Sequence, residues 1–194
     1  IQVIGPSEGS RSYATALTSQ GGSLELQGGN LVLDGANTYT GETKIYNGSL
    51  TVNGSLSDVA VVDVQGGTYR LGNADTIEGL KGSGSVDLNG NELTINQIAT
   101  LTPFSGSISG STAGSSLRKS GEGTLYLSGS SNSYSGSTFV DEGTLSISGT
   151  INNSSDIQVK SGAVLEFDAA SSRVYTGVIS GQGGLTKISA GSLE

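Results

Sequence analysis

Apolar residues recur two positions apart in short bursts along the chain, and each burst is bounded by Gly, Asn or Ser. This alternation is typical of β-strands that bury one face, and no stretch shows the spacing of an amphipathic helix. The pattern therefore predicts an all-β chain with an aliphatic inner face. The bursts are Leu24/Leu26, Leu31/Leu33, Leu50/Val52, Val62/Val64, Tyr69/Leu71, Val86/Leu88, Leu93/Ile95, Leu125/Leu127, Leu145/Ile147 and Ile157/Val159.

The bursts form couples that begin seven residues apart, as at 24 and 31, 43 and 50, and 62 and 69. A turn signal such as Asn47-Gly48 separates the two bursts and indicates a bend, although Asn-Gly is also a strong hairpin signal. The couples recur at 24, 43, 62 and 86, and again at 117, 138 and 157. A repeat this short must stack on its neighbours to bury its apolar face. We therefore predict a right-handed parallel β-helix (β-solenoid) with about 19–24 residues per rung.

A longer repeat overlies the short one, because the segment 28–56 matches the segment 121–151. An aromatic-hydroxyl-glycine step also occurs four times, and its fixed place in the repeat predicts a core or corner filler rather than a platform for ligands. Near 98–116 the regular alternation of apolar and polar residues is interrupted at Pro103, which predicts a loop or an irregular rung. The aromatic-hydroxyl-glycine steps begin at Tyr39, Phe104, Tyr134 and Tyr175.

The order of these residues is L-x-K-x-G-x-G-x-L-x-L-x-G, then Y-[ST]-G-x-T, then G-x-L-x-[VI]-x-G. It resembles the autotransporter-associated β-strand repeat of passenger domains in Gram-negative type V secretion. The resemblance covers repeat units near 28–56, 117–151 and, in part, 175–194. We expect a loop or partial cap over 1–20 and a β-helix over 21–194. The resemblance implies a fragment of a longer passenger, which is connected to the membrane only through a C-terminal barrel absent from this chain.

The composition narrows the classes of partner. Charged residues make up 13% of the chain and the net charge is −8, with 17 acidic and 9 basic side chains. This charge repels phosphate backbones and anionic lipids, which argues against nucleic acid and membrane surfaces as partners. The chain has no Cys, which is usual for a cytosolic protein but also suits a protein that crosses an oxidising periplasm unfolded.

Candidate chemistry is sparse, because a chain without His or Cys cannot build the common nucleophilic triads or thiol metal sites. Gly84 to Asp87 is only a fragment of a calcium-binding nonapeptide. Adjacent residues on a strand point to opposite faces, so Asp141 and Glu142 are not expected to converge. We expect scattered solvated charges and assign no catalytic, cofactor-binding or metal-binding residue. The acid groups considered are Asp58 with Asp63, Asp75 with Glu78 and Lys81, and Asp141 with Glu142.

These observations and the resemblance together favour a non-enzymatic segment of a secreted or cell-surface autotransporter passenger. We expect it to act as a structural stalk or adhesin scaffold that supports secretion and surface display, with no cofactor. The resemblance implies an extracellular position at the outer membrane of a Gram-negative cell, a role in cell adhesion and virulence, and a receptor on a host or bacterial surface. Two alternatives stay open: a polysaccharide-active enzyme built on a β-helix, and a self-associating module for aggregation.

Overall fold

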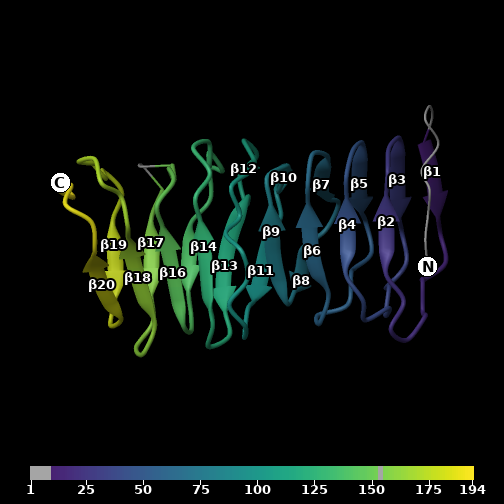
Figure 1. Ribbon diagram of the computed structural model, residues 1–194, viewed down its shortest axis with the longest axis horizontal. Helices are drawn as coiled ribbons and strands as arrows, with labels where there is room; N and C mark the ends of the chain where they lie inside the picture. Colours follow the sequence, from purple (N-terminus) through teal and green to yellow (C-terminus); the bar gives the residue numbers. More distant parts are fainter. Residues whose placement is uncertain (1–9, 153–154) are drawn as a thin grey trace.

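The computed structural model describes residues 10–152 and 155–194, and these residues are all-β with no helix. The strands wind into a parallel β-solenoid of about nine turns, here called coils. The coils stack side by side into a rod, with β1 (Ser10–Tyr13) at one end and β20 (Gly184–Lys187) at the other (Figure 1). At about 4.8 Å between neighbouring strands, nine coils correspond to a rod of roughly 40 Å. The predicted all-β solenoid is confirmed.

Each coil passes over up to three faces, which are named first, second and third in the order in which the chain meets them from β2 onward. The first face contains β2 (Leu24–Leu26), β4 (Thr43–Ile45), β6 (Val61–Val64), β9 (Gly79–Gly82), the single bridging residue Phe104, β14 (Thr124–Leu127), β16 (Thr144–Ile147), β18 (Val164–Phe167) and β20. The second contains β1, β3 (Asn30–Leu33), β5 (Ser49–Val52), β7 (Thr68–Leu71), β10 (Ser85–Asp87) and β12 (Ser107–Ser109). The third contains β8 (Asp75–Ile77), β11 (Glu92–Asn96), β13 (Ser116–Ser120), β15 (Thr138–Val140), β17 (Ile157–Val159) and β19 (Ile179–Gly181).

The core consists of aliphatic columns that run along the rod. On the second face, for example, Leu50 pairs with Leu31 on one side and with Tyr69 on the other, in parallel register. Every burst predicted from the sequence is buried, and Leu50 and Leu145 have no exposed surface. Burial of one such side chain stabilises the fold by about 1.5–3 kcal/mol, so each added coil extends the core.

The corners between faces depend on glycine. Gly48 follows Asn47 with a φ of +80°, a conformation that L side chains rarely adopt. A Cβ at Gly48 would also overlap the carbonyl oxygen of Gly29 in the coil before. The strands on either side, β4 and β5, lie in different sheets, so the Asn-Gly signal marks a bend and not a hairpin.

The duplicated segment does not return to the same face. Leu31 lies on the second face and its counterpart Leu125 on the first, while Thr43 lies on the first face and its counterpart Thr138 on the third. The chain between the two copies therefore does not complete a whole number of turns. The repeat encodes corners and coil-to-coil contacts, which work in the same way on any face.

Two segments depart from regular coils. Between β11 and β12 the first face is reduced to Phe104, directly after Pro103, which confirms the irregular rung expected near 98–116. Within the predicted loop or cap at 1–20, residues 10–13 form β1 and pair with β3, while residues 1–9 lie outside the described residues.

Candidate functional site

The repeat motif places a tyrosine inside each of its two full copies. The Tyr39 hydroxyl lies 2.6 Å from Thr43 Oγ1, and the Tyr134 hydroxyl lies 2.6 Å from Thr138 Oγ1. Both tyrosines are buried, and burial raises the pKa of both phenols. Phe104 is buried as well, whereas Tyr175 near the last coils is half-buried. The prediction of an aromatic core filler is confirmed, and the motif threonine supplies the partner that the buried hydroxyl needs.

Two buried asparagines connect three successive coils. Asn37 Oδ1 accepts from the Leu17 amide of the coil before at 3.0 Å. Its Nδ2 donates to the Gly35 carbonyl of its own coil at 2.8 Å and to the Ser55 carbonyl of the coil after at 2.9 Å. One side chain thus supplies an acceptor for the Leu17 amide and adds a second donor to carbonyls that also accept backbone amides.

Asn132 repeats this arrangement in the second copy. Its Oδ1 accepts from the Ile108 amide at 2.9 Å, and its Nδ2 donates to the carbonyls of Gly129 at 3.4 Å and Thr150 at 2.7 Å. Reasoning from sequence overlooked both residues, although each stands two positions before the motif tyrosine. That shared position was the available signal.

Asp75 occupies the comparable place in a coil without the full motif. Its Oδ1 accepts from the Leu56 amide at 3.1 Å, and its Oδ2 accepts from the Tyr69 hydroxyl at 2.6 Å. Burial raises the pKa of the Asp75 carboxyl, and the hydrogen bonds from Tyr69 and Leu56 oppose that rise. The role of this acid is therefore an internal backbone contact.

The motif lysine is also internal. Lys119 is fully buried, and its ammonium donates to the carbonyls of Ser120, Gly121 and Glu142 at 2.6 to 3.1 Å. Burial lowers the pKa of Lys119 to about 8, against the opposing effect of Glu142. Its counterpart Lys187 donates to carbonyls of two successive coils in the same way. These lysines stabilise corners and are not available to a ligand.

The structure divides the acid groups considered from the sequence between the inside and the outside of the coils. Asp75 lies inside the coil, while Lys81 lies on the outer surface and binds Glu42 at 2.5 Å. Asp63 is 3.8 Å from Lys81, and Asp58 lies exposed outside this cluster. The structure therefore separates Asp75 from Lys81 and joins Lys81 to Glu42, a partner that sequence reasoning had not considered.

Asp141 belongs to a ladder of ion pairs on the outer side of the third face. Arg118 Nε lies 2.8 Å from Glu92 Oε1, Arg118 Nη1 lies 2.8 Å from Asp141 Oδ2, and Lys160 Nζ lies 3.0 Å from the same Asp141 oxygen. Burial opposes ionisation of Asp141, yet Lys160 and Arg118 hold the pKa of its carboxyl below the usual value. The Arg118 guanidinium also stacks 4.2 Å above the Phe139 ring. The network thus links side chains of four successive coils.

The described part of the chain does not contain a cluster of metal-binding side chains. Within residues 10–152 and 155–194 no three acidic, His or Cys residues gather closely enough to hold a metal ion. Asp87, in the calcium-like fragment, instead pairs with Arg70 at 2.6 Å.

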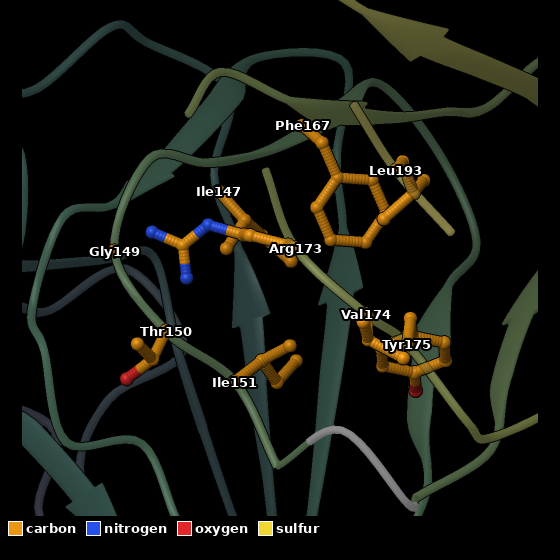
Figure 2. Close-up of a pocket in the computed structure, with 9 residues that line it drawn as sticks. All are labelled: Ile147, Gly149, Thr150, Ile151, Phe167, Arg173, Val174, Tyr175 and Leu193. Atoms are coloured by element: carbon orange, nitrogen blue, oxygen red, sulfur yellow. The ribbon is translucent and has the colours of Figure 1, made fainter. Parts of the chain in front are cut away.

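A small apolar pocket of about 180 Å³ lies between the last coils (Figure 2). Ile147, Ile151 and Phe167 form much of its wall, and the rings of Phe167 and Tyr175 lie 6.2 Å apart. Arg173 borders the pocket and donates to the Ser148 carbonyl at 3.0 Å. The lining of this pocket contains no carboxylate, so it offers no carboxylate for acid–base catalysis. We interpret the pocket as a packing gap between coils.

The fold and the internal contacts define a structural repeat protein of the β-solenoid class. Residues 21–52 and 117–147 match the family of the passenger-associated-transport-repeat, which is a structural repeat and not a known enzyme family. The matched repeats and the solenoid are consistent with an autotransporter passenger domain, a class that implies extracellular or surface display. Comparisons with curated proteins and with solved structures found no match.

The matched segments contain Asn37, Tyr39 and Thr43 in the first copy and Lys119, Asn132 and Tyr134 in the second. The repeat signature thus coincides with the internal polar contacts described above. Among the described residues no helix is long and apolar enough to cross a membrane.

Proposed function

We propose that this chain is the stalk of a surface-displayed autotransporter passenger and serves as an adhesin scaffold at the outer membrane of a Gram-negative bacterium. The observation that supports the proposal most directly is the coil-to-coil pairing: in the described part of the chain each strand pairs only with strands of adjacent coils, and the motif residues reinforce those same contacts. A rod of this kind extends by addition of coils without a new core.

The same geometry suits export of an unfolded chain. Because every strand pairs with neighbours about 17 to 24 residues away, a newly emerged coil needs only the coil before it as a template. Folding outside the cell would then keep each exported coil outside and disfavour its movement back across the outer membrane. The polar outer rows of the three faces supply a long surface for a receptor on a host or bacterial cell.

The experiment places the chain between a signal peptide and an outer-membrane translocator in a Gram-negative host. Display is measured as the fraction of chain that external protease degrades on intact cells. We expect the wild type to reach the surface. We expect Leu145→Asp, which buries a carboxylate within β16, to reach it far less, since an unpaired buried charge prevents the coil from forming.

The matched control is Gln158→Asp, which places the same carboxyl group on an outward position of β17. This variant should be displayed like the wild type. Wild-type chain that stays inside cells with an intact translocator would contradict the proposal, and so would equal display of Leu145→Asp in an unfolded form.

A further inference from the structure

The outer surface of the first face has a polar hollow of about 330 Å³ beside β9. It lies where the sheet is interrupted: β9 pairs along its length with β6, but on its other side only Gly82 is bridged, to Phe104. Residues 102, 103 and 105 line the hollow where a regular strand would otherwise continue.

Pro103 explains the interruption. Proline has no backbone N–H to donate to a strand and restricts the residue before it, so pairing can resume only at the next residue. The Phe104 amide then donates to the Tyr126 carbonyl at 2.9 Å, and the Ser105 amide donates to the Gly82 carbonyl at 2.8 Å. The hollow is therefore built into the fold by one residue.

Charged side chains on the outer side of the first face alternate in sign along the rod. Glu25, Lys44, Asp63 and Lys81 follow one another in register across β2, β4, β6 and β9. This row ends at the interruption, so its last two members, Asp63 and Lys81, line the hollow.

Asp63 presents an incompletely paired carboxylate to the hollow although the residue is only 6% exposed. Its Oδ1 accepts from Gln65 Nε2 at 2.6 Å. Its Oδ2 lies 3.8 Å from Lys81 Nζ, which is too long for a hydrogen bond. Because Asp63 lines the hollow, this oxygen has room to accept a hydrogen bond from a donor placed there.

The charges around the hollow select the chemistry of a ligand. The lining has one carboxylate, Asp63, and one ammonium, Lys81, and the nearby Glu42 is paired with both Lys81 at 2.5 Å and Lys44 at 3.2 Å, so no net charge favours an anion. The Lys81 ammonium at the same place disfavours a metal cation. A neutral polyhydroxyl ligand satisfies both conditions, because each hydroxyl can donate to Asp63 or accept from Lys81.

We infer that this hollow binds one ring of a neutral sugar. Its volume lies at the lower end of the range for ligand pockets, about 300–1,000 Å³, which suits a single ring. Thr102 and Ser105 add hydroxyl groups to its edge, and the Pro103 ring offers an apolar surface to the carbon face of the sugar. The inference does not rest on export of the chain, since it concerns the folded solenoid alone.

The test uses the isotope-labelled 194-residue chain and the methyl glycosides of glucose, galactose, mannose and N-acetylglucosamine. We expect at least one glycoside to shift NMR signals only around the hollow, at Gln65, Ser83 and Ser105, with a dissociation constant in the millimolar range. Asp63→Asn should weaken that binding by about tenfold or more, because it removes a charge-assisted hydrogen bond.

Two further variants separate binding from folding. Ser105→Phe fills the hollow from an exposed position and should abolish the shifts while circular dichroism and the melting temperature stay unchanged. Glu25→Gln alters the same charged row two coils away and should bind like the wild type. The inference is wrong if no glycoside shifts these signals, if the shifts map elsewhere, or if folded Ser105→Phe still binds. Display of the chain on cells would be unaffected by any of these results.

Discussion

Replacement of Asn132 by leucine tests whether the internal asparagines hold the coils together. Leucine has the same branching and number of side-chain heavy atoms as asparagine, so no cavity is left at this 3% exposed position while the hydrogen bonds are lost. The Ile108 amide loses its acceptor and the Thr150 carbonyl loses its donor, and these groups belong to the coils on either side.

The expected cost follows from those two groups. Each buried polar group left without a partner costs about 1–3 kcal/mol, so the free energy of unfolding should fall by about 2–6 kcal/mol. This is a large part of the roughly 5–15 kcal/mol that stabilises a typical domain. Exposed Asn53, whose Nδ2 bonds Asp34 on the surface, is the matched control, and Asn53→Leu should cost less than about 1 kcal/mol.

The assay combines urea unfolding, followed by circular dichroism, with hydrogen exchange of the Ile108 amide. In Asn132→Leu this amide should exchange faster than in the wild type, because the contact that closes the corner is missing. Asn37→Leu should act in the same way on the Leu17 amide. An unchanged unfolding free energy together with unchanged exchange at Ile108 would refute the proposed role of the asparagine.

Three other outcomes are expected. Burial raises the pKa of Asp75 above that of the unfolded chain, so ionisation of this carboxyl lowers the stability of the fold as the pH rises. The variant Asp75→Asn should therefore melt at or above the wild-type temperature at pH 7. A lower melting temperature at that pH would contradict this. Three buried phenols, of Tyr39, Tyr69 and Tyr134, should lose their protons only as the protein unfolds, so the stability of the fold should decrease above about pH 10. Phenolate absorbance from all tyrosines in a sample that is still folded would disprove this expectation. Gly149→Ala should destabilise the chain strongly in thermal melts, because its Cβ would overlap the Gly129 carbonyl oxygen, whereas Gly28→Ala has open space and should have little effect.

The sequence predicted the general role of several site residues but not their individual contacts. The sequence predicted that the recurring aromatics are internal, and Tyr39 and Tyr134 are buried beside threonines of the same motif. It did not reveal that Lys81 lies beside both Asp63 and Glu42, because these acids are 18 and 39 positions away from Lys81 and come near it only when coils stack. Nor did it distinguish Asp75, an internal acceptor, from the acids on the surface.

The sequence by itself determined the strands, the corners and the approximate length of a coil, which was predicted at 19–24 residues and is 17–24 in the structure. These features are local: alternation with period two decides which side chains face inward, as at Leu50 and Val52, and glycine permits the bend at Gly48. The tertiary structure alone decided which face each repeat occupies and where the first face is interrupted. Coil length varies along the chain, from 17 residues between Thr68 and Ser85 to 24 between Leu93 and Leu117, so small differences accumulate and turn the second copy of the repeat onto another face.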